Sequence, residues 1–136
     1  MKKIKNKAGT IAYRNNDSGN IEVLLVSSRK HKDSWVFPVG TVEKNETLEQ
    51  AAKRECVEES GYIVELENNI DTTTIENPDE INIFTFFSAR VIGETDDYEK
   101  DRKRIWIDLN LLSDKVAEFL VDTANKFKSM TLVNQS

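Results

Sequence analysis

The first third of the chain alternates short apolar or β-branched runs with turn residues. Residues 10–14 and 21–28 form two such runs, and the polar stretch Asn-Asn-Asp-Ser-Gly-Asn between them is typical of a hairpin loop. A shorter extended run at residues 35–37 ends at Pro38, which disfavours helix at the residue before it. The pattern therefore predicts three strands that lead into a glycine turn at Gly40.

The next segment carries the signals of a helix. Thr47 and Gln50 have the spacing of a capping box, residues 48–60 contain neither proline nor glycine, and Gly61 is typical of a helix C-cap. Beyond it, residues 62–66, 70–75, 81–91 and 104–108 have strand-like patterns, with a turn at 77–79. Apolar residues recur at helical spacing over 114–127, and 130–136 read as a tail. Because no repeat or low-complexity linker interrupts this order, we expect one domain over residues 1–136, with about 129–136 as its tail and a mixed sheet between helices.

The helix at 48–60 changes character along one face. At 100° per residue its apolar stripe continues into Glu55, Glu58 and Glu59. One interpretation is a solvated acidic face that pairs with Lys53 and Arg54. However, negative charge near a helix C-terminus is disfavoured by roughly 0.3–1 kcal/mol per group. Carboxylates three and four residues apart also repel unless a cation lies among them, and Mg²⁺ is the simplest candidate.

Composition limits the classes of partner. The chain has 136 residues, a formal net charge of −5 and a single cysteine, Cys56, which we expect to be packed in the helix. The acidic balance argues against broad nucleic-acid binding, and the charged start predicts neither a signal peptide nor a membrane anchor. We expect a cytoplasmic location that can also include the nucleus. Basic residues nevertheless gather at 2–7, 29–32 and 102–104, so a polyanionic small molecule is a plausible substrate.

The spacing of the acidic segment resembles the signature of the Nudix hydrolases. Gly40 is followed after five residues by Glu46, and after seven more by Arg-Glu-Cys-Val-Glu-Glu-Ser-Gly-Tyr at 54–62. The resemblance implies an α/β fold, a Nudix-like α/β/α sandwich with a mixed β-sheet. It also implies hydrolysis of a phosphoanhydride bond with Mg²⁺ or Mn²⁺, a chemistry that metal-held water and a carboxylate base can supply.

The same resemblance assigns roles within the motif. Glu55 and Glu59 would ligate the metal together with the loop at Gly40, whose lack of a side chain permits close approach. Glu58 would take the proton from water as the catalytic base, and Arg54 would orient the glutamates by ion pairing.

Outside the motif, residues 23–31, Trp35, Pro38 and Arg-Lys-Arg at 102–104 before Trp106 are similar to the diphosphoinositol polyphosphate phosphohydrolase subgroup. Its enzymes also cleave diadenosine polyphosphates. The predicted substrate contacts are Lys5, Lys7, Ser28, Arg29, Lys30 and Arg102, together with the turn Val39, Gly40 and Thr41.

Two departures from the subgroup bear on the substrate. The turn at 39–41 keeps one glycine, and Asp-Glu-Ile-Asn at 79–82 stands where the subgroup is basic. A less charged dinucleoside polyphosphate tolerates both changes better than a diphosphoinositol polyphosphate. The alternatives are a Nudix hydrolase of capped RNA, the one nucleic-acid substrate we retain, or of a nucleoside diphosphate sugar. A non-catalytic sensor of nucleotides or inositol phosphates is a third alternative.

Overall fold

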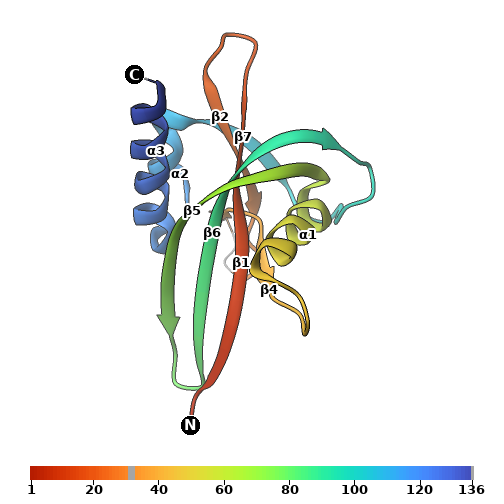
Figure 1. The fold of residues 1–136 in the computed structure, drawn as a ribbon, viewed down its shortest axis with the longest axis vertical. Helices are drawn as coiled ribbons and strands as arrows, with labels where there is room; N and C mark the ends of the chain where they lie inside the picture. Colours follow the sequence, from red (N-terminus) through yellow and green to blue (C-terminus); the bar gives the residue numbers. More distant parts are fainter. Residues whose placement is uncertain (31–32, 136) are drawn as a thin grey trace.

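The computed structural model describes residues 1–30 and 33–135, with side chains as far as residue 131. Its strands are β1 Lys3–Asn15, β2 Ile21–Ser27, β3 Trp35–Val36, β4 Val39–Thr41, β5 Tyr62–Glu76, β6 Glu80–Glu94 and β7 Arg104–Asp108. Its helices are α1 Leu48–Ser60, α2 Leu112–Lys115 and α3 Val121–Gln135. Helix α1 lies on one side of the sheet and α2 and α3 on the other, which confirms the α/β/α sandwich (Figure 1).

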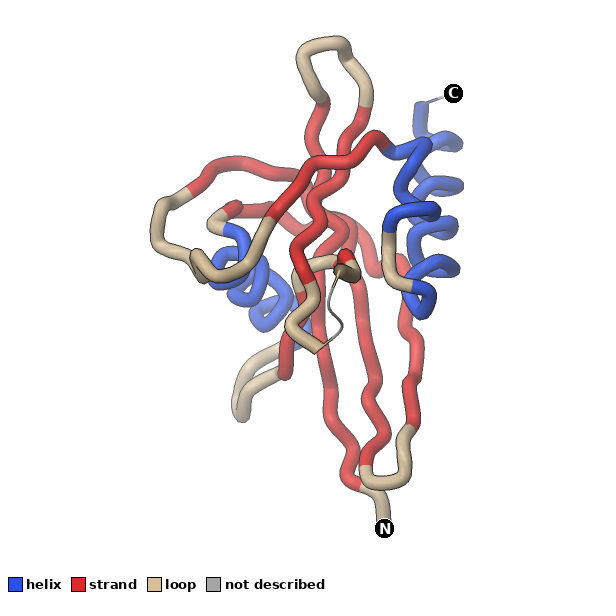
Figure 2. Tube along the Cα trace, turned by 180° about the vertical axis from the view of Figure 1, so that it is seen from behind, coloured by secondary structure: helices blue, strands red, loops and turns tan. Residues whose placement is uncertain are grey.

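The strands form one seven-stranded mixed sheet in the order β3-β2-β1-β6-β5. Its central pair, β1 and β6, is parallel, whereas β1–β2 and β5–β6 are antiparallel. Strand β4 pairs with β1 at residues 7–9, and β7 pairs with β2. The outer halves of β1, β6 and β5 run past the helices as a three-stranded ribbon that ends near the N-terminus (Figures 1 and 2).

Several strands are longer than the local sequence predicts. The hairpin of β1 and β2 and the strand at 104–108 are confirmed, but β1 begins at Lys3 rather than at residue 10. The segments at 62–66 and 70–75 are one strand, β5, with register shifts between Leu66 and Asp71. The polar residues at 3–7 form a strand because their backbone groups pair with those of β6. Since β6 is distant in sequence, the local pattern could not predict this pairing.

The helix predicted at 114–127 is wrong. Helix α2 ends at Lys115, and Val116 is extended because it bridges Trp35, whose carbonyl accepts a 2.9 Å hydrogen bond from Ala117 N. After a 3₁₀ turn, α3 starts at Val121 and continues to Gln135, through most of the segment that the sequence predicts to be a tail. A tertiary contact thus outweighs the local helical spacing.

The two faces of the sheet are packed by side chains of different size. Large residues such as Phe37, Phe86 and Leu120 fill the side of α2 and α3. Small residues face α1, where Ala51 and Ala52 pack on the sheet and Cys56 is buried, as predicted for that cysteine. Small side chains allow α1 to lie close to the sheet, which brings its carboxylates to β4. No helix in the described part of the chain is long and apolar enough to cross a membrane.

Candidate active site

Both ends of α1 are held by local interactions. Thr47 Oγ1 accepts from Gln50 N at 3.0 Å, and the Gln50 side chain accepts from Thr47 N at 2.9 Å, so the predicted capping box is present. Gly61 ends the helix with φ 79°, a left-handed conformation that favours glycine. These caps fix where the helix begins and ends, and the helix has the predicted bounds of 48–60. They thereby fix the direction in which its glutamates point.

Arg54 holds the acidic side chains in place. Its Nε and Nη2 donate to the two oxygens of Glu46 at 2.7 and 2.9 Å. Its Nη1 donates to Glu55 at 2.7 Å and to Glu58 at 3.2 Å, and Nη2 also reaches the Thr41 carbonyl at 3.1 Å. Hydrogen bonds from this guanidinium lower the pKa of Glu46 to about 2. One cation therefore ties three glutamates to the loop before the helix, as the orienting role of Arg54 requires.

Glu59 and Glu55 form a carboxylate pair under β4. The Glu59 side chain is only 2% exposed, and burial, followed by a hydrogen bond with Glu55, raises its pKa well above the usual range. Val39 N donates to Glu59 at 3.4 Å, and Arg102 Nη1 lies 3.6 Å away. A Cβ at Gly40 would overlap the Glu55 carboxylate, so only glycine lets the strand approach so closely.

This pair fits a divalent cation. Two carboxylates in contact repel unless a proton or a metal lies between them, and hard oxygen ligands are those that Mg²⁺ and Mn²⁺ prefer. Within the described residues no three His, Cys, Asp or Glu side chains converge on one point. Glu55 and Glu59 would therefore hold the ion with backbone oxygen, such as that of Gly40, and water. These are the metal-binding residues that the sequence predicts.

Glu58 differs from this pair in its exposure. Its side chain is half exposed, and its contact is the 3.2 Å ion pair with Arg54 Nη1. Its backbone carbonyl accepts from Glu99 N at 2.8 Å, which joins this end of α1 to the loop before β7. A carboxylate that is oriented yet open to solvent is suited to bind and deprotonate a water molecule.

A cavity of about 640 Å³ opens beside Glu59. The predicted substrate residues that line it are Lys7, Ser28, Arg29, Lys30, Val39, Gly40 and Arg102. Lys5 and Thr41 are not brought into this lining. Lys5 instead pairs with Glu80 at 2.5 Å, and the Thr41 hydroxyl accepts from Lys7 Nζ at 2.8 Å. The basic run at 29–32 includes residues 31 and 32, which lie outside the described residues.

The cations of this cavity are held by acidic neighbours that the sequence reasoning missed. Glu99 accepts from Arg102 Nε at 2.9 Å and lies 3.1 Å from Arg29. Asp101 accepts from Arg29 Nη2 with both oxygens at 3.0 Å. Burial, then the neighbouring cations of which Lys30 is the first, lower the pKa of Lys7. The spacing of Glu99 three residues before Arg102 is the sequence signal that could have revealed the first pair.

The remaining residues of the lining were not predicted as part of the site. They are Val36, Ile75, Asn77, Asn82, Phe84 and Phe119. The ring of Phe84 contacts those of Phe86 and Phe119. The alternation of side chains along β6 could have placed Asn82 and Phe84 on one face.

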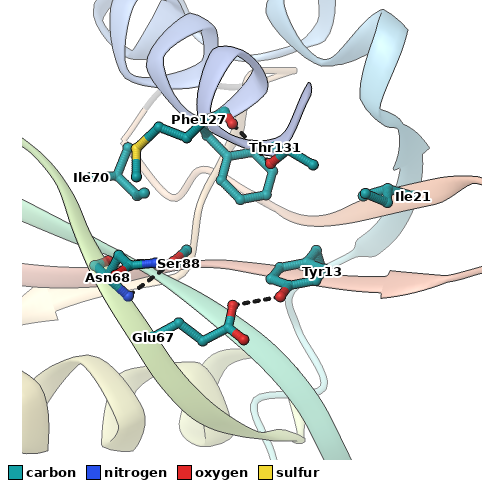
Figure 3. A pocket seen from close by; sticks show the side chains of 9 residues that line it. Tyr13, Ile21, Glu67, Asn68, Ile70, Ser88, Phe127 and Thr131 are labelled. Carbon is teal, nitrogen blue, oxygen red and sulfur yellow. Dashed lines mark hydrogen bonds between the residues drawn. The ribbon is translucent and has the colours of Figure 1, made fainter. Parts of the chain in front are cut away.

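A second cavity of about 190 Å³ lies between β5 and α3 (Figure 3). Tyr13 donates to Glu67 there at 2.5 Å, and burial, followed by this hydrogen bond, raises the pKa of Tyr13 to about 12. Phe127 and Ile70 form its apolar wall. None of the residues that the sequence assigns to metal, catalysis or substrate lines this second cavity.

Comparison with known proteins identifies the family of this chain. A family model described as the NUDIX domain matches residues 5–127. Diphosphoinositol polyphosphate phosphohydrolase 2 of Rattus norvegicus is 33% identical over 106 residues, covering 75% of this chain and 57% of the relative. Nudix hydrolase 21, chloroplastic, of Arabidopsis thaliana is 40% identical over 58 residues, covering 43% of this chain and 29% of the relative. The matched regions thus span between 29% and 57% of the length of these relatives.

Solved structures share the fold. The binary complex of a C. elegans Ap4A hydrolase superposes with a TM-score of 0.75 and 21% identity, covering 94% of this chain and 98% of that one. The Nudix hydrolase RenU of M. Smegmatis has a TM-score of 0.76 and 18% identity, and the match covers 94% of this chain and 86% of that one. At these identities the likeness establishes the architecture.

Proposed function

This chain belongs to the Nudix domain family, and from that premise we propose that it is a metal-dependent phosphoanhydride hydrolase. Its proposed substrates are diphosphoinositol polyphosphates, diadenosine polyphosphates or both. The observation that carries the proposal is the Glu55–Glu59 pair beside Gly40, because Glu59 and Gly40 line the same cavity as Lys7 and Arg102. An acidic pair beside cations is the arrangement that a metal-bound polyphosphate needs.

Binding begins with the cations of the cavity. Lys7 and Arg102 come from β1 and from the loop before β7, so they approach a phosphate chain from two sides. Arg102 is already oriented, because Nη1 donates to the Ser27 carbonyl at 3.0 Å and Nε donates to Glu99. A planar guanidinium held in this way presents its remaining donors to a phosphate without losing much side-chain entropy.

The hydrolytic step requires a nucleophile and a neutralised leaving group. Glu55 and Glu59 would hold the Mg²⁺ or Mn²⁺ ion, which would supply positive charge to neutralise the phosphates and would make a nearby water more acidic. Glu58 accepts a proton from the attacking water while the oxygen of that water forms a bond to phosphorus. The bridging P–O bond breaks, and its electron pair leaves with the departing phosphate. Arg54 keeps Glu58 oriented throughout through its 3.2 Å contact.

The test is turnover of a substrate panel with increasing Mg²⁺. Diadenosine hexaphosphate, diphosphoinositol pentakisphosphate, capped RNA and ADP-ribose are incubated with the protein, and the products are quantified. Hydrolysis of either of the first two supports the proposed substrates, whereas hydrolysis of only the last two overturns them. Absence of turnover throughout the panel overturns the proposed activity.

A substitution tests the assignment of the base. Glu58→Gln preserves the shape of the side chain but removes the proton acceptor, so we expect kcat to fall by roughly 10²- to 10⁴-fold with an unchanged melting temperature. Glu49→Gln is the matched control, because Glu49 lies in the first turn of the same helix and is exposed. Full activity of the Glu58 variant would show that another group is the base.

A further inference from the structure

The lining of the large cavity combines two chemically different sets of residues. One set is charged and comprises Lys7, Arg29, Lys30, Glu59 and Arg102. The other set, here called the apolar end, is mainly uncharged: Val36, Ile75, Asn77, Asn82, Phe84 and Phe119. A ligand that fills the whole cavity therefore has an anionic part and an apolar part.

Strand register places these features in order along the ribbon. Lys7 of β1 lies beside Phe84 of β6, and two residues further out Lys5 lies beside Asn82, which also faces Ile75 of β5. Residues two apart on a strand share a face and are separated by roughly 6.6 Å. Moving outward from the carboxylate pair, a ligand thus meets a cation next to an aromatic ring, and then an amide next to an aliphatic side chain.

Asn82 is an unusual residue for such a wall. It is only 8% exposed, and within the described part of the chain its side-chain amide has no hydrogen-bond partner. The other cavity amide differs, because Asn77 Oδ1 accepts from Asp79 N at 2.9 Å and from Glu80 N at 2.8 Å. The amide atoms of Asn82 are reached by solvent from the cavity, because Thr10 Oγ1 is the only side-chain oxygen or nitrogen among the described residues that is both buried and without a partner. Asn82 is therefore available to a ligand in the cavity.

The apolar end is poorly suited to a heavily phosphorylated ring. A heavily phosphorylated ring would require several cations, yet Lys5, the basic residue beside Asn82, is already paired with Glu80 at 2.5 Å, and Lys30 is the further cation whose charge reaches Glu80. The aromatic residues instead offer a surface to a flat ring. Phe84 and Phe119 have ring centroids 5.6 Å apart, are tilted by 54° and are both only partly buried. Such faces favour a heterocycle over a polyanion.

We propose that the apolar end binds the base of a nucleoside polyphosphate and that Asn82 is the residue that recognises the edge of the base. The inference rests on the proposed function and selects the nucleotide over the inositol phosphate as its substrate class. An amide presents a donor and an acceptor side by side, which complements the amino group and adjacent ring nitrogen of adenine. The phosphates then extend past Lys7 toward Glu55 and Glu59.

Binding of matched analogues tests this directly, without turnover. Calorimetry in Mg²⁺ compares α,β-methylene-ADP with methylenediphosphonate, which has the same bridged phosphates but no nucleoside, and with inositol hexakisphosphate. We expect α,β-methylene-ADP to bind at least about 10-fold more tightly than either of the others. Equal affinity for the two phosphonates, or tighter binding of inositol hexakisphosphate, would overturn the proposal.

Substitutions then assign the effect to one side chain. Asn82→Ala, and Asn82→Leu as a variant of similar volume, are expected to weaken α,β-methylene-ADP by roughly 10- to 100-fold and to leave methylenediphosphonate unchanged. Asn6→Ala is the matched control, since Asn6 is an exposed asparagine on the opposite face of the same ribbon. Equal weakening of both ligands, or none, would refute the role of Asn82.

Hydrolysis separates this inference from the proposed function. With diadenosine hexaphosphate we expect Asn82→Ala to raise KM while kcat stays within about twofold, because the residue lies away from the reacting phosphates. If the wild-type protein cleaves no phosphoanhydride yet binds α,β-methylene-ADP through Asn82, the proposed activity fails and the base site stands. If it cleaves diphosphoinositol pentakisphosphate in preference to diadenosine hexaphosphate, the activity stands and the base site fails.

Discussion

Replacing Gly40 by alanine tests whether the contact between β4 and α1 sets the chemistry. The three atoms nearest to a Cβ at this position are the carboxylate atoms of Glu55, and all would overlap it. Gly40 does not have a positive φ, so alanine fits its backbone and the conflict is confined to the mobile end of one side chain. The substitution therefore moves a proposed metal ligand without disturbing the core.

The expected magnitudes follow from this geometry. Relieving the overlap displaces the Glu55 carboxylate by about 1 Å, and a misplacement of that size costs roughly 100-fold in turnover. The free energy of unfolding should change little. Alanine lowers the conformational entropy of the unfolded chain, which favours folding by about 0.4–1 kcal/mol and offsets the local repulsion. We expect the melting temperature to stay within roughly 5 °C of the wild type.

The assay measures kcat/KM over a Mg²⁺ titration together with thermal unfolding followed by circular dichroism. Gly93→Ala is the control, because a Cβ at Gly93 of β6 meets its nearest neighbour, Ile63 Cδ1, at an ordinary 3.7 Å. It should retain activity. If Gly40→Ala is as active as Gly93→Ala, the close approach of Gly40 to Glu55 has no part in the reaction. If Gly40→Ala does not fold, the role of Gly40 is structural.

Three further changes probe the fold and the site. Arg54→Lys keeps the positive charge but cannot make the paired bonds of a guanidinium, so kcat should fall at least about tenfold in the Mg²⁺ assay; unchanged kcat would contradict its orienting role. Burial opposes the ionisation of Asp71, but hydrogen bonds from Lys126 and Thr123 outweigh it and lower the pKa of this carboxyl group. The ionised carboxylate therefore stabilises the fold at neutral pH, and this stabilisation is lost as the pH falls through the lowered pKa of Asp71. Asp71→Asn should therefore lower the urea midpoint at pH 7 but not near pH 3, and an equal loss at both would disprove the ionic contribution. Gly61→Ala places a Cβ in a left-handed position and 2.6 Å from a backbone oxygen, so it should destabilise by more than about 1 kcal/mol in urea unfolding; no change would show that this cap is unimportant.

Local sequence was sufficient for the helix that carries the chemistry. Its capping box, its length and Gly61 depend on residues within a few positions of one another, so the pattern predicted its bounds correctly. The acidic face was visible for the same reason, because a fixed rotation per residue brings Glu55 and Glu59 together. The contacts of Arg54 with three glutamates also follow from positions close to one another in the chain.

Other features depended on segments that are distant in sequence. The parallel pairing of β1 with β6 turns the polar residues at 3–7 into a strand, and the bridge from Trp35 to Val116 interrupts the expected second helix. Lys5 has the positive charge expected of a residue that binds phosphate, but its side chain forms an ion pair with Glu80 of the neighbouring strand. None of these long-range pairings produces a periodic pattern in the amino-acid sequence from which it could be predicted.

The amino-acid sequence by itself determined the caps and acidic face of one helix, and through them the family and the predicted metal chemistry, because helical geometry relates residues three and four apart. Only the tertiary structure decided which cations reach the cavity and that Asn82 and Phe84 are part of its lining. Strand register and charge pairing join residues far apart along the chain, and those contacts form only when the whole sheet assembles.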